Sequence, residues 1–310
     1  MPKVSVIVPV YRVEQYIARC ARSLFDQTLE DIEFIFVDDC SPDHSVEVLE
    51  DILSKYPKRR EQVRILHMPE NSGQAAVREM GVKAASGDYV IHCDSDDEPL
   101  LTMYETMWRQ ADGSGADVVL CDYYVMEKEK ERIVKACPDR LEDPVGALLC
   151  GAMGGYSWNK LVRRTLYDSI ALSPVADIWE DKVMMVQLLS SCQTWTVVRE
   201  PLYRYRINPQ GICLSSEVRY RIAALQANVS VILRFLEENG LSVRYSGEVS
   251  ALKAEVQMHA LPLSKKEYLA LYPENRWKQL FVSCIPSARK MGHLTKLLGI
   301  HGISKAFRRT

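Results

Sequence analysis

The stretch YVIHCDSDD, residues 89–97, decides the fold class. Its first five residues are mostly apolar or aromatic, as in a strand buried at the centre of a sheet. Its last four residues carry three carboxylates, whose mutual repulsion is costly unless a cation lies among them. A buried strand that ends in acids is typical of the edge of an α/β sheet where ligands bind.

The rest of the first 125 residues supplies the other elements of such a sheet. Short β-branched segments alternate with amphipathic ones, which predicts a doubly wound α/β layout. The expected strands are residues 4–10, 33–39, 63–67, 89–94 and 118–124, and the expected helices are residues 14–27, 45–56, 73–85 and 100–114. Polar residues at the carboxyl ends of these strands should meet in one crevice.

The later part of the chain has a less regular pattern. We expect one domain over residues 1–215, with halves at 1–125 and 126–215, followed by a helical region over 216–310. The clearest late element is a helix over residues 217–239 with Gly240 as its C-terminal cap. Residues 181–191 are also expected to be helical.

The composition is that of an ordinary globular protein of 310 residues, with 47% apolar side chains and a net charge of −2. That charge argues against a protein that covers nucleic acid. Nine cysteines without a CxxC pair indicate neither a disulfide framework nor a zinc site, so we expect a cytoplasmic, reducing location. No signal peptide and no apolar stretch of about 20 residues is visible, so any membrane contact should be peripheral.

Two acidic turns are the candidate ligand sites. In the turn at 94–97, Asp94, Asp96 and Asp97 are suited to a divalent cation that bridges diphosphate oxygens, and the alternative is a solvated acidic turn. In the turn DDCSPD at 38–43, Asp39 could accept hydrogen bonds from a base or ribose. The alternative for that turn is helix capping, above all by Ser41 or Asp43.

Four segments in order resemble one known family. They are VSVIVPVY at 4–11, VDDCSPD at 37–43, NSGQAAVR at 71–78 and DSDD at 94–97, and the likeness extends over about residues 3–210. The chain resembles the family 2 inverting glycosyltransferases with a GT-A fold. The resemblance implies a mostly parallel twisted sheet flanked by helices, and transfer of a sugar from a nucleotide-sugar, most often UDP-linked, to a hydroxyl of a glycan or lipid-linked glycan.

The resemblance also implies roles for single residues on the donor side. The nucleoside pocket would be lined by Pro9, Tyr11 and Asp39, and Arg78 would help to hold the donor. Asp94, Asp96 and Asp97 match the metal and ribose motif, with Asp96 the foremost ligand of Mn²⁺ or Mg²⁺.

The catalytic base is expected at Glu180-Asp181, which opens a helical pattern and resembles the family's Glu-Asp pair. Asp181 would take the proton of the acceptor hydroxyl as it attacks the anomeric carbon, and a single displacement inverts that carbon. The alternative is an acidic residue that caps the helix N-terminus.

Two further segments resemble the acceptor side and the donor-closing part of the family. In YSWNKL at 156–161, Trp158 could stack on a sugar, and Asn159 or Lys160 could bind its polar groups; Trp158 could equally be core. In the segment at 201–209, Arg206 is a candidate for the diphosphate, unless it belongs to the solvent-facing side of a strand. Residues 211–215 lack the family's usual hydroxyl at the expected place.

The end of the chain, residues 287–310, is basic and amphipathic without an acidic residue. It could lie on the anionic inner leaflet of a membrane, which would suit a lipid-linked acceptor in cell-surface polysaccharide assembly. The alternative is a docked or partly disordered terminal helix.

Three other functions would also use acids at strand ends or the same fold. A phosphoaspartyl enzyme would use Asp38 or Asp39 but needs a lysine at a later strand end, and none stands there. A nucleotidyltransferase would have a Gly-rich basic loop after its first strand, which VYRVE at 10–14 is not. A non-catalytic nucleotide-sugar binder or assembly subunit of the same fold remains an alternative.

Overall fold

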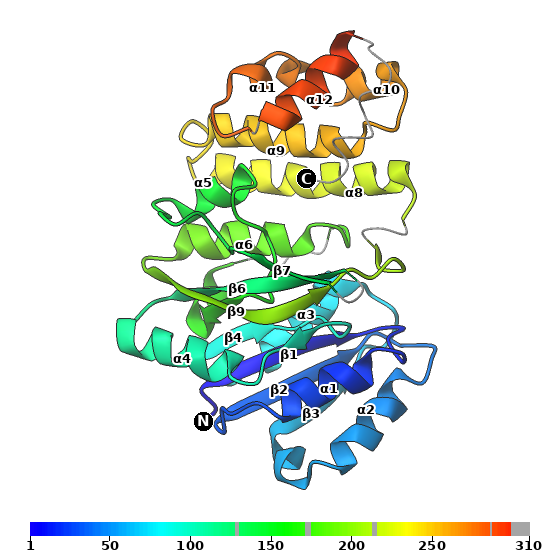
Figure 1. Ribbon diagram of the computed structural model, residues 1–310, viewed down its shortest axis with the longest axis vertical. Coiled ribbons are helices and arrows are strands. Elements are labelled where there is room, and N and C mark those ends of the chain that lie inside the picture. The colour runs from blue at the N-terminus through cyan, green and yellow to red at the C-terminus, as the bar shows by residue number, and fades with distance from the viewer. Residues whose placement is uncertain (128–129, 171–174, 213–215, 286, 299–310) are drawn as a thin grey trace. The chain divides into compact units, whose positions relative to one another are not determined.

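The computed structural model describes residues 1–127, 130–170, 175–212, 216–285 and 287–298 (Figure 1). The chain divides into two compact units, which are described separately. The first unit joins Met1–Ala136 to Tyr156–Pro209, and the second joins Cys137–Gly155 to the chain from Gln210 onward. The domain boundaries expected from the sequence differ from these units mainly at residues 137–155, which cluster with the later helices.

The first unit is built on a sheet of nine strands within the described residues, and the helices of this unit cover its faces (Figure 1). Its elements in chain order are β1 (Val4–Val10), α1 (Ile17–Phe25), β2 (Ile32–Asp38), α2 (Ser45–Ser54), η1 (Pro57–Gln62), β3 (Val63–His67), α3 (Gln74–Ala84), β4 (Tyr89–His92), β5 (Glu98–Pro99), α4 (Met103–Ser114), β6 (Val118–Glu127), β7 (Lys130–Val134), β8 (Lys160–Arg163), η2 (Arg164–Ser169), α6 (Glu180–Ser191) and β9 (Trp195–Arg206). The strand order is β3-β2-β1-β4-β8-β6-β9-β5, with β7 paired to β6.

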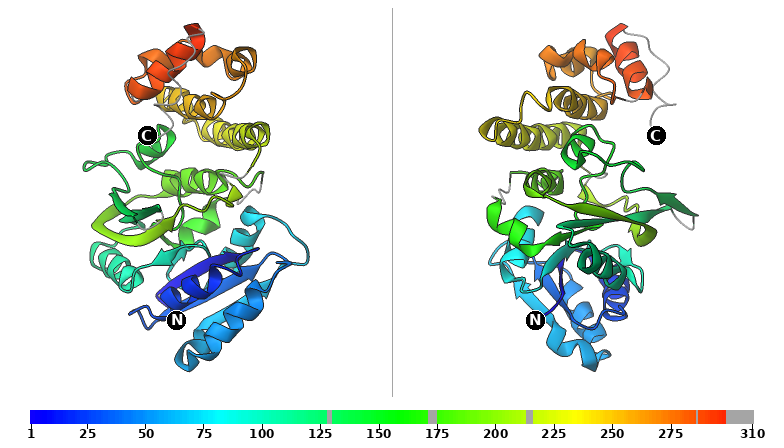
Figure 2. Two further views of the ribbon diagram at one scale, coloured as in Figure 1. Left: turned by 45° about the vertical axis from the view of Figure 1, so that its right-hand side comes forward. Right: turned by 90° about the vertical axis from the view of Figure 1, so that its left-hand side faces the viewer.

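The first four strands form the parallel part that the sequence predicts. β1 pairs in parallel with β2 and β4, and β2 pairs in parallel with β3. Alternate residues of β1 explain the layers, because Val6 and Val8 share the main core with α1 and α2. On the opposite face, Ile7 approaches Gly81 of α3 so closely that an added Cβ would lie 2.4 Å from it. The left view in Figure 2 shows these helices around the first strands.

The second half of the sheet is mixed. β8 runs antiparallel to both β4 and β6, and β5 runs antiparallel to β9, whereas β6 and β9 are parallel. The expected α/β class is therefore confirmed, but the antiparallel pairs were not foreseen. Since β8 runs against β4, the residues that lead into β8 lie at the same edge as the carboxyl end of β4.

The second unit is helical in its described part. It contains α5 (Pro144–Leu149), α8 (Val218–Glu238), α9 (Ser246–His259), α10 (Lys265–Ala270), η3 (Pro273–Asn275), α11 (Lys278–Phe281) and α12 (Ser287–Leu298). The predicted helix over 217–239 agrees with α8, and Gly240 follows it at φ +69°, a conformation that glycine adopts at helix ends. No described helix has the length and apolarity that crossing a membrane requires. The part of the basic segment beyond Leu298, and residues 213–215, lie outside the described residues.

Candidate active site

The three acids after β4 lie beside one another, and each has a different partner. Asp94 accepts from the Arg78 guanidinium at 2.9 Å, Asp96 accepts from the Asn208 side chain at 2.9 Å, and the buried Asp97 accepts from the backbone N–H of Arg206 at 2.7 Å. β9 and the residues after it therefore hold two of the three carboxylates. Asn208 was not predicted as a site residue, although it lies in the segment 201–209 that was expected to contribute Arg206.

These carboxylates are electrostatically unsatisfied. Burial, and then the charge of Asp94, raises the pKa of Asp96. Burial, and then the charges of Asp96 and Asp94, raises the pKa of Asp97 well above its usual range. The Oδ2 atom of Asp97 is buried without a hydrogen-bond partner among the described residues. The turn thus concentrates negative charge at Asp96 and Asp97, and their raised pKa values show that the described neighbours offset it only in part.

A divalent metal fits this chemistry only as an ion shared with a ligand. Across the described segments, no three His, Cys, Asp or Glu side chains stand together as ligands of one ion. Mg²⁺ in phosphate sites usually takes one or two carboxylates and completes its shell with phosphate oxygens and water. The repelling carboxylates and the orphaned Asp97 oxygen fit such a set, with Asp96 and Asp97 as its protein ligands, because Asp94 is already paired to Arg78.

Arg78, on α3, joins the β4 turn to the start of α6. Its side chain is 5% exposed, and its Nε lies 3.3 Å from Oε1 of Glu180, which is 102 residues away in the sequence. Although burial opposes the charge, the neighbouring Asp94 and Glu180 raise the pKa of Arg78. Its Nη1 is buried without a hydrogen-bond partner in the described part of the chain. The predicted donor residue is thus a bridge between two acidic groups.

The acids at the start of α6 share a buried, strained environment. Trp179, just before the helix, has φ +69°, a left-handed conformation that a tryptophan rarely adopts. Burial, and then the charge of Asp181, raises the pKa of Glu180 to about 8. Burial also raises the pKa of Asp181, while Arg78 lowers it. The two acids titrate as a pair, and one carboxylate with raised basicity suits a general base.

The turn after β2 is arranged differently, because its carboxylates are satisfied. Asp39 accepts from the backbone N–H groups of Ser72 at 2.7 Å and Gly73 at 2.9 Å, and from the Asn71 amide at 3.1 Å. The predicted base-binding residue therefore fixes the loop before α3. Gly73 cannot be replaced without strain, since its φ is +83° and a Cβ would meet Asp177 at 2.5 Å.

The neighbouring Asp43 binds groups at the start of α2, although the N-cap position itself is His44, which makes no side-chain capping bond. Asp43 accepts from the Ser41 hydroxyl at 2.6 Å and the Ser45 hydroxyl at 2.5 Å, as well as from the Ser45 N–H at 3.2 Å, at the start of α2. These bonds, opposed by partial burial, lower the pKa of Asp43. Asp38 likewise accepts from the Ser41 N–H at 3.0 Å.

The predicted nucleoside pocket has exposed and strained residues beside it. Pro9 is half-buried near the end of β1, and Tyr11 is 39% exposed, with the Arg12 guanidinium 5.3 Å from its ring centroid. Arg12 and Cys40 both have φ +53°. Strained non-glycine residues gather at ligand sites in many proteins, and here they flank Tyr11 and Asp39.

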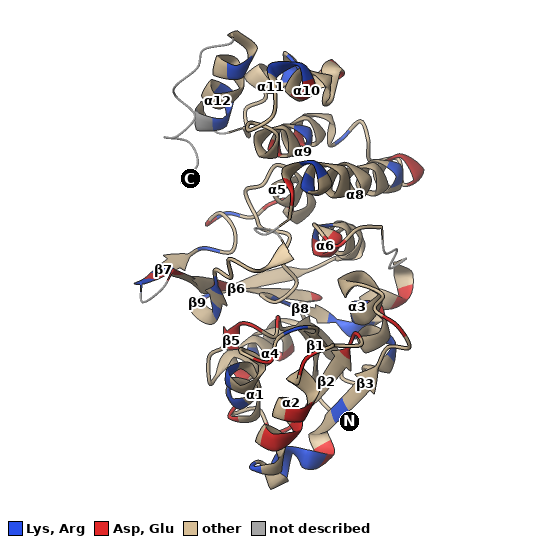
Figure 3. Cartoon of the chain, turned by 90° about the vertical axis from the view of Figure 1, so that its right-hand side faces the viewer, with Lys and Arg blue, Asp and Glu red and all other residues tan. Residues whose placement is uncertain are grey.

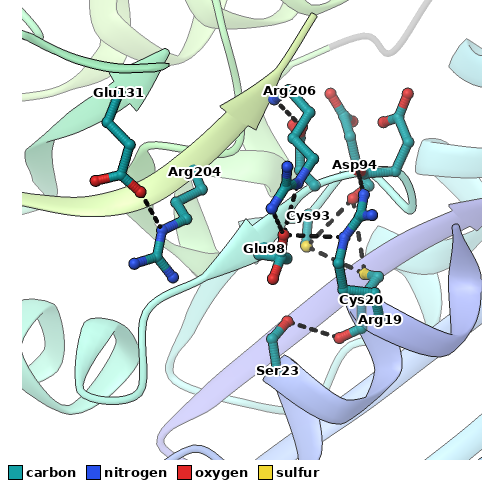
Figure 4. A network of polar contacts seen from close by, with 11 residues as sticks. Arg19, Cys20, Ser23, Cys93, Asp94, Glu98, Glu131, Arg204 and Arg206 are labelled. Atoms are coloured by element: carbon teal, nitrogen blue, oxygen red, sulfur yellow. Dashed lines mark hydrogen bonds and ion pairs between the residues drawn. The ribbon is translucent and has the colours of Figure 1, made fainter. Parts of the chain in front are cut away.

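Arg206, a predicted site residue, and Arg19, which was not predicted, both contact Glu98 beside the β4 turn (Figure 4). Oε1 of Glu98 on β5 lies 2.9 Å from Nε of Arg19 and 2.6 Å from Nε of Arg206. Arg19 also donates to the backbone oxygen of Asp96 at 3.0 Å. Arg206 is thus close to the acids, as predicted, but its guanidinium is bound to a carboxylate. The pairing of β5 with β9 brings Arg206 to Glu98, and Arg19 comes from α1, so local sequence offers no signal for the cluster.

The predicted acceptor residues are buried. Trp158 is 2% exposed and stacks on Tyr203 at 4.5 Å, which favours its core alternative. Asn159 and Lys160 are 1% exposed, and the Lys160 ammonium donates to the Asn159 side chain and to the backbone oxygen of Tyr156, each at 2.8 Å.

Comparisons with known proteins agree with this geometry. The family described as glycosyl transferase family 2 matches residues 5–170. EpsH of Bacillus subtilis (strain 168), a protein named as a glycosyltransferase, is 34% identical over 262 residues, which cover 80% of this chain and 73% of EpsH.

Solved structures share the fold at low sequence identity. TarS residues 1–349 from S. aureus, in complex with UDP-GlcNAc, superposes with a TM-score of 0.64 at 17% identity, covering 99% of this chain and 91% of that one. The mannosyltransferase PcManGT from Pyrobaculum calidifontis, in complex with GDP-Man and Mn²⁺, has a TM-score of 0.54 at 15% identity, covering 96% and 88%.

Proposed function

Since the chain belongs to glycosyl transferase family 2 and is a glycosyltransferase, we propose that it transfers a sugar from a UDP-sugar to a glycan hydroxyl with inversion, and that Asp181 is the general base. The observation that carries the proposal is the chain of contacts from Asp94 through Arg78 to Glu180. It brings the acidic turn after β4 next to the first turn of α6, which supports a donor site and a base that act on the same sugar.

The proposed reaction is a single displacement. The acceptor oxygen bonds to the anomeric carbon, the bond from that carbon to the diphosphate oxygen breaks, and its electron pair leaves with the diphosphate. The proton of the acceptor hydroxyl passes to the Asp181 carboxylate. Burial raises the pKa of Asp181 and makes it a better proton acceptor than a solvated aspartate.

The proposed donor side rests on the β1, β2 and β4 turns. Tyr11 and Pro9 would contact the nucleoside, and Asp39 would reach the base when the amides of residues 72 and 73 release it. UDP is favoured because TarS, which shares the fold, binds UDP-GlcNAc. The Mn²⁺ in the GDP-Man complex of PcManGT supports a metal of the same class, which would neutralise charge on the leaving diphosphate. Asp96 and Asp97 would hold it.

The acceptor remains a prediction: a glycan or lipid-linked glycan in cell-surface polysaccharide assembly. Peripheral membrane contact through 287–310 gains support from exposed apolar residues nearby, namely Trp277 at 58% and Phe281 at 84% exposure. Lys and Arg are blue on α12 in Figure 3. Flotation with vesicles that contain anionic lipid tests this contact, and binding that survives truncation at Ser287 would assign it elsewhere.

The first test of the function is calorimetric titration with UDP, GDP, CDP and dTDP, with and without Mn²⁺. We expect metal-dependent binding of one nucleotide, and absence of binding by all four would contradict the proposal.

The test of the base is Asp181→Asn. We expect kcat for sugar transfer to fall by about 10²- to 10⁴-fold, because an amide does not take the proton. Affinity for the nucleotide should stay within about twofold. Unchanged kcat in this variant would remove Asp181 from the mechanism.

A further inference from the structure

The structure contains a stack of aromatic rings that starts at the β4 turn. The Asp94 backbone N–H donates to the Tyr203 hydroxyl at 3.1 Å. Tyr203 stacks on Trp158 with ring centroids 4.5 Å apart and planes 10° from parallel. Trp158 in turn stacks on Tyr156 at 4.8 Å and 18°, and on Tyr205 at 5.6 Å and 9°. The stack therefore runs outward from a predicted donor residue.

Burial decreases along this stack. Tyr203 is fully buried and Trp158 is 2% exposed, whereas Tyr156 and Tyr205 are only half-buried. Tyr156 and Tyr205 also stack on each other, with centroids 6.1 Å apart and planes 26° from parallel. The inner rings thus serve as a rigid core, and the outer two form a partly accessible aromatic surface.

The strand directions place this surface at the reactive edge. β8 runs antiparallel to β4, so Tyr156, which leads into β8, lies at the edge where β4 ends. β9 is parallel to β6, which also runs against β8, so Tyr205 near the end of β9 reaches the same edge. The next residue, Arg206, donates its backbone N–H to Asp97.

The surface is also linked to the candidate base. The Lys160 ammonium donates to the backbone oxygen of Tyr156 at 2.8 Å, and its charge acts on the Asp181 carboxyl to lower the pKa. Tyr205 directly precedes Arg206, whose backbone N–H binds Asp97.

We propose that Tyr156 and Tyr205 form the subsite that binds a pyranose ring of the acceptor, by stacking against its apolar C–H face. This inference rests on the proposed transferase function and replaces Trp158, whose faces are covered, as the stacking residue. The electron-rich face of a phenol ring attracts the weakly positive C–H groups of a sugar, and its hydroxyl edge can bond to the sugar's own hydroxyls.

The experiment uses the full chain saturated with the nucleoside diphosphate that it binds, and saturation-transfer NMR. The probes are methyl β-D-glucopyranoside, methyl N-acetyl-β-D-glucosaminide and methyl β-D-galactopyranoside. We expect at least one glycoside to receive saturation on its ring protons from wild type, and its Kd to rise about fivefold or more in Tyr205→Leu. Tyr205→Phe keeps the ring and should stay within about twofold of wild type.

Controls separate stacking from folding. Tyr220, which is 50% exposed on α8, provides the matched variant Tyr220→Leu, which should bind the glycoside as wild type does. Unchanged nucleotide affinity shows that Tyr205→Leu is folded, and if it is not, Tyr156→Leu carries the same test.

Two outcomes overturn the subsite. One is a wild-type chain that binds a nucleotide but passes saturation to none of the glycosides, and the other is an undiminished signal in Tyr205→Leu. A wild-type chain that binds no nucleotide would overturn the proposed function itself.

Discussion

The two acidic turns of the sheet, after β2 and after β4, are similar in sequence and opposite in their electrostatics. In the β2 turn, Asp39 and Asp43 accept hydrogen bonds from backbone and hydroxyl groups nearby. In the β4 turn, Asp96 and Asp97 repel each other, and one Asp97 oxygen has no partner among the described residues. Carboxylates in the first turn are satisfied by hydrogen bonds of the fold, whereas Asp96 and Asp97 in the second carry repulsion that a positive ligand would relieve.

The largest effect expected from these two turns sets them directly against each other. Asp96→Asn should lower kcat by about 10²- to 10³-fold, as loss of one group that stabilises transition-state charge does in other enzymes. Steady-state assays with the nucleotide-sugar identified by calorimetry measure it. Asp43→Asn, the matched variant in the β2 turn, should change kcat by less than about twofold. Equal losses in both variants would remove the distinction between the turns.

A smaller effect is expected on stability from the β2 turn. Asp43→Ala removes the acceptor for Ser41 and Ser45 and should lower the free energy of unfolding by about 1 kcal/mol at pH 7. Because hydrogen bonds lower the pKa of Asp43, its contribution is present above the unfolded pKa and is lost as pH falls through the folded one. Urea unfolding at pH 7 and at pH 3 measures the difference. A loss that persists undiminished at pH 3 would argue against the ionised cap.

The smallest effect has the opposite sign and belongs to the β4 turn. Burial and neighbouring charges raise the pKa of Asp97, so its ionisation costs stability as pH rises from the unfolded pKa through the folded one. Asp97→Asn keeps an acceptor for the Arg206 N–H and removes the charge, so Tm should rise by roughly 2–4 °C at pH 8, equivalent to about 1 kcal/mol. The gain should vanish near pH 3. A lower Tm at pH 8 would show that the charge is satisfied after all.

The sequence predicts the parallel part of the sheet well because its signals are local. β1 and β3 begin and end at the predicted residues. The acids after β4 lie at the carboxyl end of that strand, as predicted. The antiparallel strands β5 and β8 are short and pair with strands that are distant in the sequence. They are too short to show the alternation of apolar and polar residues that predicts a strand.

The hydrogen-bond and ion-pair partners of the site residues were harder to predict than the strands. Asn208 and Arg19 reach the acidic turn only through tertiary packing. For Asp39, the sequence leaves base binding and capping open, and the amides that occupy it belong to a loop more than thirty residues later. A tryptophan at position 158 fits a sugar-binding role and a core position equally well from the sequence. Only its burial in the structure decides between these two roles.

Arg78 links the acidic turn after β4 to the acids at the start of α6. One buried guanidinium divides its attraction between Asp94 and Glu180. Any donor complex that draws Asp94 away leaves more of that attraction to the acids of α6, which favours their ionised form. Such coupling is reciprocal, so ionisation of Glu180, which Arg78 contacts, would strengthen donor binding by the same factor. This ion-pair network would therefore couple occupancy of the donor site to the protonation state of the first turn of α6.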